Sequence, residues 1–231
     1  MITVKERLKM KTDRVLGLAV NEHLKGLGIN TPIVPEKLAV EKETKIDKIE
    51  KHMIEILSIL GLDLTDDSLC ETPRRVAKMY VNEIFSGLLP ENFPKCTTVE
   101  NKFSGTDDFV LEKNITLYSD CEHHIRPIVG VVHVAYIPGD KVLGLSKLHR
   151  VCQYFGQRPQ VQERLTQQIA EAIAFVTGSE DVVVMVDAKH LCVSQRGIRD
   201  VTSSTATMTA KGRFKEDSQL RSEFVRNVTA S

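Results

Sequence analysis

The sequence has no tryptophan, few aromatic residues and no excess of charge of either sign. Aromatic residues make up 5% of the 231 residues, and 31 Lys and Arg residues balance 31 Asp and Glu residues. Proteins that bind nucleic acid usually carry a basic excess or expose aromatic side chains on which bases stack. The composition therefore argues against a nucleic-acid partner, although it leaves room for a local basic pocket that binds a small anion.

Long apolar runs are equally scarce. None is much longer than Val182–Val186, whereas a membrane-spanning helix needs roughly 20 apolar residues. The first residues, MITVKERLKMKTDR, are charged and lack the apolar stretch of a secretory signal. We therefore expect a cytoplasmic protein that makes no contact with a membrane.

The cysteines do not form the pattern of a disulfide framework. They are odd in number and spread along the chain, at positions 70, 96, 121, 152 and 192. Disulfide frameworks are typical of small secreted chains with an even number of cysteines, so reduced thiols or metal ligands explain these residues better. A GxxxxGK[ST] phosphate loop is also missing, so side chains would have to hold any nucleotide phosphate.

The first 95 residues are predicted to be mostly helical. Apolar residues recur at helical spacing from Ile46 to Leu60. In ETPRRVAKMYVNEIFSG, Thr72 is the expected N-cap, a proline follows in the first turn, and Gly87 comes after the end of the helix. We predict that residues 1–95 form a helical region that precedes a mixed domain.

Residues 96–231 are predicted to form an α+β domain. From about Phe103 the pattern favours strands, as in DFVLEKNITLYS and PIVGVVHVAYIPGD. Two helical stripes follow at Leu148–Phe155 and Leu165–Val176, and then two further strands, DVVVMVDAKHLCVS and DVTSSTATMTAKGRF. A short helix ends the pattern. We expect antiparallel strands with two packed helices.

Two short segments carry metal-ligating residue types. In SDCEHHIRP, Cys121 and His124 form a C-x2-H pair, a spacing that lets one turn present both side chains to a single ion. In DAKHLCVS, His190 and Cys192 are two residues apart, and we expect them side by side on one face of a strand. Thiolate and imidazole ligands together suit zinc.

Three of these residues could form a catalytic zinc site. Cys121, His124 and Cys192 would leave a fourth coordination position open, as catalytic zinc sites do, whereas structural sites are usually closed by four ligands. His123 and His190 would then be imidazoles beside the metal, suited to proton transfer near neutral pH. The spacing alone does not decide between such a site and a chance arrangement of polar residues.

A second group of residues could bind a nucleotide base. Gln162 and Glu163 open a predicted helix, and an amide beside a carboxylate can bind the donor edge of guanine. A Glu in the first turn of a helix is also favoured simply by the helix dipole, which is the stronger explanation for Glu163 taken alone.

Basic residues could hold phosphate groups. In SQRGIRD, Arg196 and Arg199 flank a glycine, and guanidinium groups match phosphate oxygens. The segment GLSKLHRVCQYFGQRPQVQERLT is also basic, but a solvated helix face is the better explanation for any single one of its cations, which are Lys147, Arg150, Arg158 and Arg164.

Five motifs together resemble one known family. The segments CEHH, GLSKLHR, QERLT, HLCV and RGIRD, in this order, resemble GTP cyclohydrolase I, the zinc enzyme that opens the pathway to folate and pterins. The resemblance runs from about Leu57 to the C-terminus, and the first 40 residues are not covered. It implies the tunnelling fold, in which antiparallel sheets and helices assemble into a barrel. It also implies a ring-shaped homodecamer of two pentamers with sites at subunit interfaces.

The resemblance also implies a role for individual residues. Zinc would be bound by the same three residues that the spacing suggested, Cys121, His124 and Cys192. His123 and His190 would transfer protons. Guanine would be recognised by Gln162 and Glu163. Ser146 is counted with the catalytic residues, and it lies next to the group that would handle the ribose and the triphosphate, namely Lys147, Arg150 and Arg196.

The implied reaction is the hydrolysis of GTP. Zinc makes a water nucleophilic near neutral pH; the water attacks C8 of guanine while His123 protonates N7. C8 leaves as formate, and the ribose carbons rearrange to give 7,8-dihydroneopterin triphosphate. Two alternatives stay open. One is a tunnelling-fold enzyme for another purine, such as a nitrile reductase, which would lack the Cys-His-Cys set. The other is a zinc-stabilised protein without turnover.

Overall fold

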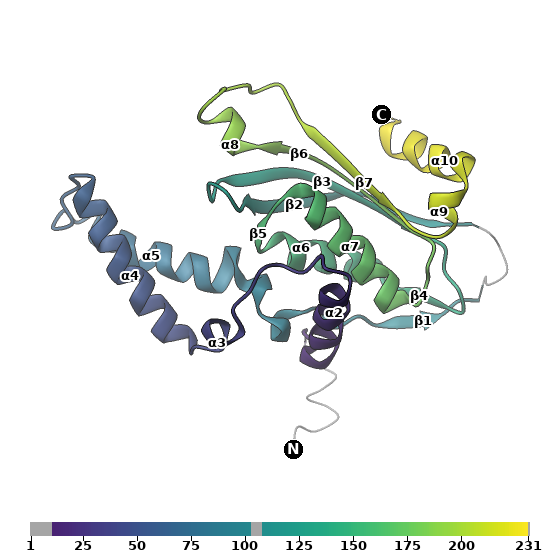
Figure 1. The fold of residues 1–231 in the computed structure, drawn as a ribbon, viewed down its shortest axis with the longest axis horizontal. Helices are drawn as coiled ribbons and strands as arrows, with labels where there is room; N and C mark the ends of the chain where they lie inside the picture. The colour runs from purple at the N-terminus through teal and green to yellow at the C-terminus, as the bar shows by residue number, and fades with distance from the viewer. Residues whose placement is uncertain (1–10, 103–107, 231) are drawn as a thin grey trace, which may run out of the picture.

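The computed structural model describes residues 11–102 and 108–230, and its N-terminal part is helical (Figure 1). This part contains four α-helices, α2 (Arg14–Gly26), α3 (Pro35–Leu38), α4 (Lys42–Ile59) and α5 (Thr72–Met79). A π-helical turn, η1 (Tyr80–Ile84), continues α5, and two 3-10 turns follow, η2 (Ser86–Leu88) and η3 (Pro90–Asn92). Thr72 is the first residue of α5 rather than its N-cap, which is Glu71.

The rest of the described chain combines strands and helices. The strands are β1 (Thr98–Glu100), β2 (Val110–Cys121), β3 (Pro127–Tyr136), β4 (Lys141–Leu143), β5 (Pro159–Gln160), β6 (Val182–His190) and β7 (Thr205–Ala210). The helices are α6 (Leu145–Gly156), α7 (Gln162–Thr177), α8 (Leu191–Ser194), α9 (Arg213–Glu216) and α10 (Ser218–Thr229). The predicted strands and helices of this part are confirmed, except that the strand predicted over residues 181–194 ends at His190 and continues into α8. Phe103, where the strand pattern was expected to start, lies outside the described residues.

Five strands form the central sheet, in the order β5-β2-β3-β6-β7. β2, β3, β6 and β7 pair antiparallel with their neighbours, and the short β5 pairs parallel with β2. Because β2 and β6 are both antiparallel to β3, they run in the same direction. Their C-terminal ends therefore lie on the same side of the sheet, flanking the first residues of β3.

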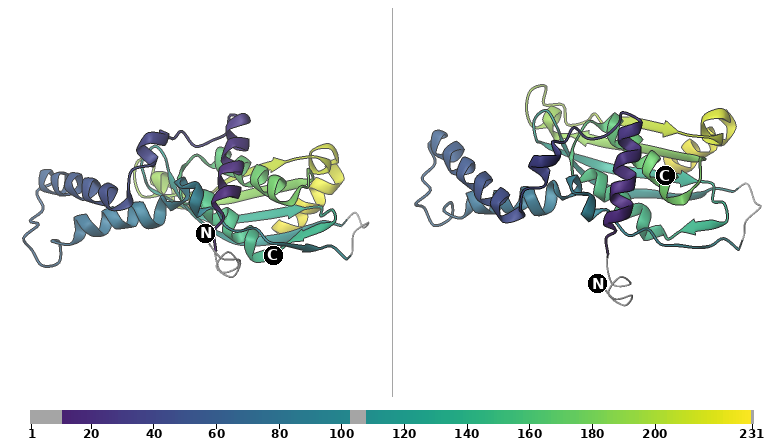
Figure 2. Two further views of the ribbon diagram at one scale, coloured as in Figure 1. Left: turned by 90° about the horizontal axis from the view of Figure 1, so that it is seen from below. Right: turned by 60° about the horizontal axis from the view of Figure 1, so that its bottom comes forward.

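The two faces of the sheet are covered differently (Figure 2). Helices α6 and α7 cover one face, and the main core lies between them and the sheet, with Val132, Leu148 and Ile169 fully buried in it. Helices α9 and α10 cover part of the other face through a smaller cluster around Phe214 and Phe224. This is the predicted α+β arrangement of an antiparallel sheet with two packed helices.

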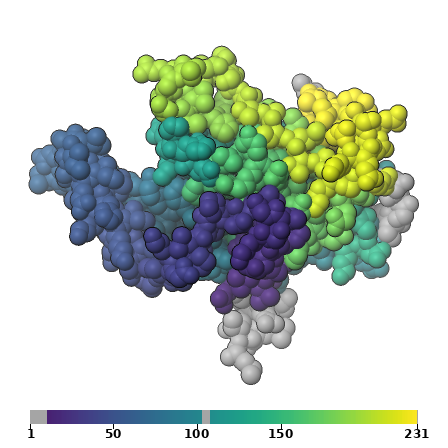
Figure 3. All heavy atoms as spheres, in the orientation of Figure 1, coloured from purple at the N-terminus to yellow at the C-terminus, as the bar shows by residue number. Residues whose placement is uncertain are grey.

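The N-terminal helices divide between the core and a projecting arm. Helix α2 contributes Val20 and Leu24 to the main core. Helices α4 and α5 instead form a hairpin that projects from the body (Figure 3), held together by ion pairs from Arg74 on α5 to Glu43, Asp47 and Glu50 on α4. The boundary that the sequence predicts near residue 95 stays a prediction.

The structure also tests the predictions about membrane spans and about Arg158. None of the helices in residues 11–102 and 108–230 is long and apolar enough to cross a membrane. Arg158 was expected on a solvated helix face, and that expectation is wrong. Its side chain is 1% exposed, its guanidinium stacks on the rings of Tyr154 and Phe155, and its Nε donates a hydrogen bond to the Gly87 carbonyl.

Candidate active site

The turn between β2 and β3 holds the first half of the candidate site. Cys121 is the last residue of β2, and its backbone N–H donates to the Arg126 carbonyl at 2.9 Å. The Cys121 carbonyl accepts from the Ile125 N–H at 2.8 Å, and Ile125 has a φ of 49°. The tight turn keeps the Cys121 side chain buried, at 6% exposure, and leaves His123 and His124 exposed.

The end of β6 supplies the second half of the site. His190 is the last residue of β6 and pairs with Ile128 of β3. The expectation that His190 and Cys192 share one face of a strand is wrong, because the chain turns into helix α8 at Leu191. The physical reason lies in the partner strand. β3 starts at Pro127, which has no backbone N–H, so no ladder remains for β6 beyond this point.

The three predicted metal ligands converge. The ligand atoms of Cys121, His124 and Cys192 all lie within 4.8 Å of one another. Burial and the neighbouring Cys121 sulfur raise the pKa of the Cys192 thiol above its ordinary value. The Cys192 thiol thus resists losing its proton unless a cation compensates the charge, and a coordinated thiol is deprotonated by the metal. Two sulfur donors and one imidazole are a set that fits zinc.

The other two histidines differ in their surroundings. The His123 side chain is 65% exposed, and its Nδ1 lies 3.8 Å from the Cys121 sulfur. His190 is half-buried, and its Nε2 lies 2.7 Å from Oε1 of Gln162. Burial lowers the pKa of His190, and the nearby Glu163 carboxylate opposes this shift. His123 is thus open to a ligand, whereas His190 is held by a protein contact.

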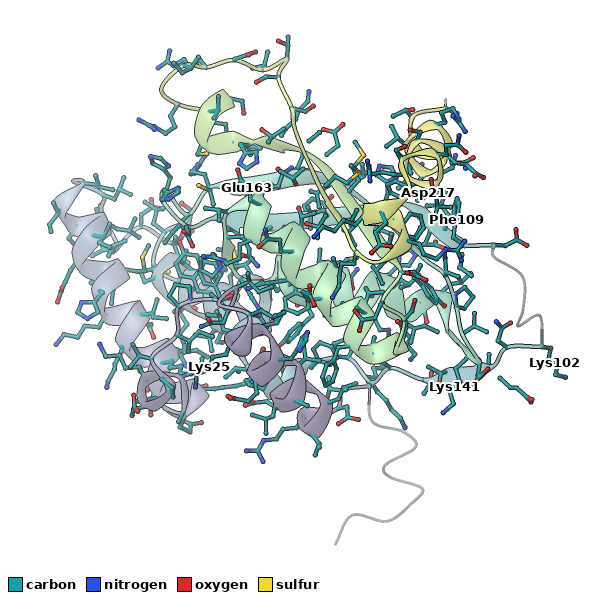
Figure 4. The ribbon with its side chains drawn as sticks, turned by 45° about the vertical axis from the view of Figure 1, so that its right-hand side comes forward. Lys25, Lys102, Phe109, Lys141, Glu163 and Asp217 are labelled. Atoms are coloured by element: carbon teal, nitrogen blue, oxygen red, sulfur yellow. The ribbon has the colours of Figure 1, made fainter. Side chains whose placement is uncertain are left out.

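Gln162 and Glu163 occupy the start of α7 but face different surroundings. The Gln162 side chain is 2% exposed and is hydrogen-bonded to Val186, Thr205, Thr207 and His190. Glu163 is exposed at the N-terminal end of α7 (Figure 4). In this chain the carboxylate is therefore free to meet a ligand, while the amide is engaged within the protein.

The predicted phosphate-binding residues do not gather in one place. Nη1 of Arg196 lies 3.2 Å from Nε2 of His124, so this arginine adjoins the cluster. Ser146, Lys147 and Arg150 lie on α6, directly after β4, and the backbone N–H of Leu143 in β4 is hydrogen-bonded to the Tyr136 hydroxyl.

Within one chain, the region of Ser146, Lys147 and Arg150 lies far from Cys121, His124 and Cys192. Tyr136 ends β3, and the β2–β3 turn, which carries Cys121 and His124, adjoins Pro127 at the start of β3, ten residues and roughly 30 Å away. Figures 1 and 4 show this separation, with α8 and Glu163 toward one end of the sheet and β4 and Lys141 at the other. One copy of the chain does not bring all the predicted site residues together.

Sequence analysis assigned no role to an ion pair that supports the β2–β3 turn. Nη2 of Arg164 on α7 lies 2.5 Å from Oε2 of Glu122, and the same guanidinium donates to Gln160 and Pro159 of β5. The Glu122 N–H also donates to the Gln160 carbonyl at 3.0 Å. Glu122 stands between Cys121 and His123 in the sequence, so its position was a usable signal, but its partner could be found only in the structure.

A cavity adjoins the turn on the side of the projecting arm. Its volume is about 790 Å³, and its mostly apolar lining includes Tyr80, Phe85 and Ile125 as well as Glu122 and His123. The predicted phosphate-binding residues do not line it. The exposed His123 ring thus borders both the metal-ligand cluster and this cavity.

The chain is similar in sequence to one family of known proteins. A family model described as GTP cyclohydrolase I matches residues 49–229. The chain is 52% identical to GTP cyclohydrolase 1 of Yersinia enterocolitica over 209 residues, covering 90% of this chain and 94% of that protein. It is 53% identical to GTP cyclohydrolase 1 of Citrobacter koseri over the same shares of both chains.

A solved structure is also similar to part of the chain. It is a dihydroneopterin aldolase from Burkholderia thailendensis, determined bound to guanine. The similarity has a TM-score of 0.32 and 12% sequence identity, and it covers 57% of this chain and 98% of that one.

Proposed function

Because this chain belongs to the GTP cyclohydrolase I family, we propose that its Cys121, His124 and Cys192 side chains bind the zinc ion of a catalytic site. Members of this family have the tunnelling fold and act on GTP. The enzyme opens the imidazole ring of GTP at C8 by hydrolysis, releases formate and forms 7,8-dihydroneopterin triphosphate, the first step of tetrahydrofolate and pterin biosynthesis. The convergence of two thiols and one imidazole carries the metal assignment.

The chemistry divides between the metal and the protein. A zinc ion at this cluster would supply a water that is nucleophilic near neutral pH. The protein side chains bind the base, hold the triphosphate and move protons. His123 is exposed beside Cys121 and donates a proton to N7 as the ring opens. His190, whose pKa is lowered by its half-buried position, serves as the second proton-transfer group.

The polar residues around the cluster bind the substrate. The Glu163 carboxylate accepts from the N1–H and N2–H2 donors of guanine, because it is exposed at the start of α7 and close enough to His190 to influence its pKa. Arg196, beside His124, contributes one cation for the triphosphate. Ser146, Lys147 and Arg150 complete the site for ribose and phosphates.

The separation of these residues supports a shared site. Ser146, Lys147 and Arg150 lie at the far end of the sheet from the metal ligands of the same chain, so a second copy must provide them. We propose a homodecamer of two pentamers with active sites at subunit interfaces. The projecting α4 helix supports further contacts between copies, since it exposes the apolar side chains of Ile54, Ile56 and Ile59. The cytoplasm suits this enzyme, because its thiol ligands must stay reduced.

The first experiment tests the metal and the reaction together. Purified protein is incubated with GTP before and after metal stripping, and pterin fluorescence and formate are measured. Fluorescent pterin with an equal amount of formate, abolished by stripping and restored by zinc, is the expected result. Protein that holds zinc but yields neither product would overturn the catalytic proposal and would favour a zinc-stabilised protein that does not turn GTP over.

A further inference from the structure

Gln162 is buried where the start of α7 meets β6 and β7. Its amide nitrogen Nε2 lies 2.7 Å from the Thr205 carbonyl oxygen, 3.2 Å from the Val186 carbonyl oxygen and 3.1 Å from Oγ1 of Thr207. Its amide oxygen Oε1 lies 2.7 Å from Nε2 of His190. With only 2% of the residue exposed, these contacts are closed off from bulk solvent.

These partners determine the orientation of the amide. Backbone carbonyl oxygens only accept hydrogen bonds, so the group that faces Val186 and Thr205 must be the NH2 of Gln162. The flipped amide would place its oxygen against two carbonyl oxygens at hydrogen-bond distance, which is repulsive. The amide oxygen must therefore face His190.

The neighbouring hydroxyl groups agree with this orientation. Oγ1 of Thr166 donates its one proton to the Gln162 carbonyl at 2.8 Å. Oγ1 of Thr207 lies 2.6 Å from Oγ1 of Thr166 and must therefore donate to it. The Thr207 oxygen keeps its lone pairs and is free to accept from the Gln162 amide, so every proton in the network has an acceptor.

The orientation of the amide also settles where His190 carries its proton. An amide oxygen only accepts, so Nε2 of His190 must be the donor of the 2.7 Å hydrogen bond. In a neutral imidazole only one ring nitrogen carries hydrogen, and the other is a base. Nδ1 of His190 is then the nitrogen that is able to accept a proton.

We propose that Gln162 is a positioning residue that holds His190 as the Nε2–H tautomer, with Nδ1 as its proton-accepting atom, and that Gln162 does not itself bind guanine. The proposal rests on the proposed role of His190 in proton transfer. It separates the two adjacent residues of the QERLT motif, because Glu163 meets the substrate whereas Gln162 acts through a histidine that follows it by 28 residues.

Steady-state kinetics separate this role from guanine binding. Gln162→Met keeps the length of the side chain and removes every hydrogen bond, so both tautomers and other ring orientations become accessible to His190. We expect kcat for pterin formation to fall about 10- to 100-fold, with KM for GTP changed less than about twofold. A side chain that binds guanine would instead raise KM when it is replaced.

A second buried glutamine on the same helix provides the control. Gln168 is 0% exposed, and its amide is hydrogen-bonded to Gln160 and to the Ile29 carbonyl, away from His190. Gln168→Met should lower the melting temperature about as much as Gln162→Met while kcat stays within about twofold of wild type. An equal loss of kcat in both variants would reduce the role of Gln162 to general stability and overturn the proposal.

Solid-state 15N NMR of protein labelled at histidine measures the tautomer directly and tolerates a large oligomer. The His190 signals are identified by their loss in His190→Asn, in both zinc-loaded and metal-stripped protein. We expect a protonated Nε2 and an unprotonated Nδ1 in wild type, and a mixture of tautomers in Gln162→Met. A predominant Nδ1–H form in wild type would overturn the proposal. If wild-type protein made no pterin, the proposed function would fail, while the spectrum would still decide the tautomer.

Discussion

The cysteines show how surroundings decide what one residue type can do. Cys152 is 0% exposed in the main core, and burial raises the pKa of its thiol to about 12, so it stays protonated and chemically inert. Cys96 is similar, since burial raises its pKa to about 11. Cys121 and Cys192 instead lie beside each other and beside His124. Among the cysteines that the structure describes, only these two lie close enough to other ligand atoms to bind a metal ion with them.

Replacement of single site residues should separate metal binding from proton transfer. Cys121→Ser is expected to remove bound zinc and to lower turnover of GTP below detection, because one of three protein ligands is lost. His123→Ala should keep about one zinc per chain while kcat falls at least about 100-fold, because only a proton donor is lost. Zinc content by atomic emission and pterin fluorescence measure both effects. Loss of zinc from His123→Ala would show that ligand and acid have been interchanged.

A buried histidine away from the site should make stability depend on pH. His133 is 5% exposed on β3, and its Nδ1 accepts a 3.4 Å hydrogen bond from the Asn114 N–H. Burial lowers its pKa, Lys113 on β2 lowers it further, and Asp187 on β6 opposes the shift. Because the unfolded state binds the proton more readily, the free energy of unfolding should fall as the pH drops below about 6.5, by no more than about 1.4 kcal/mol per pH unit.

Denaturant unfolding at pH 7.5, 6.5 and 5.5, at one protein concentration, tests this linkage. His133→Gln should flatten the dependence of stability on pH relative to wild type, since it removes the titrating group. His52→Gln, at an exposed position on α4, serves as the control and should keep the wild-type slope. An unchanged slope in His133→Gln would assign the acid sensitivity to other groups.

At the scale of elements, the sheet creates the proposed metal site by ending two strands on the same side. β2 and β6 flank β3 and run in the same direction, so their last residues lie on either side of the start of β3. The β2–β3 turn then contributes Cys121 and His124, and helix α8 contributes Cys192. The ion pair from Arg164 on α7 to Glu122 joins this turn to the helix layer.

Loss of the Arg164–Glu122 ion pair should make the β2–β3 turn more mobile and weaken zinc binding. Arg164→Met keeps the apolar part of the side chain and leaves Glu122 without its guanidinium partner. We expect zinc to bind about tenfold more weakly, the lower end of the range for residues that orient metal ligands, as measured by competition with a chromogenic chelator. Arg74→Met, which loses three carboxylate partners on the α4–α5 arm, should leave zinc affinity unchanged. Equal zinc affinity in Arg164→Met and wild type would contradict a supporting role for the ion pair.

At the scale of the whole molecule, the residues of the proposed site fall into two separate groups within one chain. The metal-ligating turn and Glu163 lie at one end of the sheet, and Ser146 and Lys147 lie on α6 near the other end. A monomer with this geometry cannot close all these residues around one GTP molecule. The proposed homodecamer would then be part of the mechanism and not only a source of stability.

Mixed assemblies should reveal the shared site. Cys192→Ser and Lys147→Ala are each expected to be inactive when assembled alone, because every site then lacks one residue. Co-assembly after joint unfolding and refolding, or by co-expression, should restore about a quarter of the wild-type activity, because random pairing of halves leaves that share of interfaces intact. Mixed oligomers that stay inactive, while wild-type mixtures recover, would place both residues in the same subunit's site.

The sequence by itself determined the residue types of the site and the class of the fold. The sequence was enough to nominate the zinc ligands, through the C-x2-H pair, the later His-x-Cys pair and the family motifs. Zinc is bound by cysteine and histidine side chains, and closely spaced pairs of these residues are typical of zinc sites. Alternating and helical periodicities were enough to predict the α+β arrangement, because burial of one face imposes them locally.

Only the tertiary structure decided how these residues act together. Cys192 meets Cys121 through a turn into α8, although its spacing from His190 suggested a strand, because strand pairing ends where its partner strand ends. Gln162 and Glu163 look equivalent in the sequence, yet one is buried among carbonyl groups and the other faces solvent. Such differences depend on contacts between distant segments, and no local pattern records them.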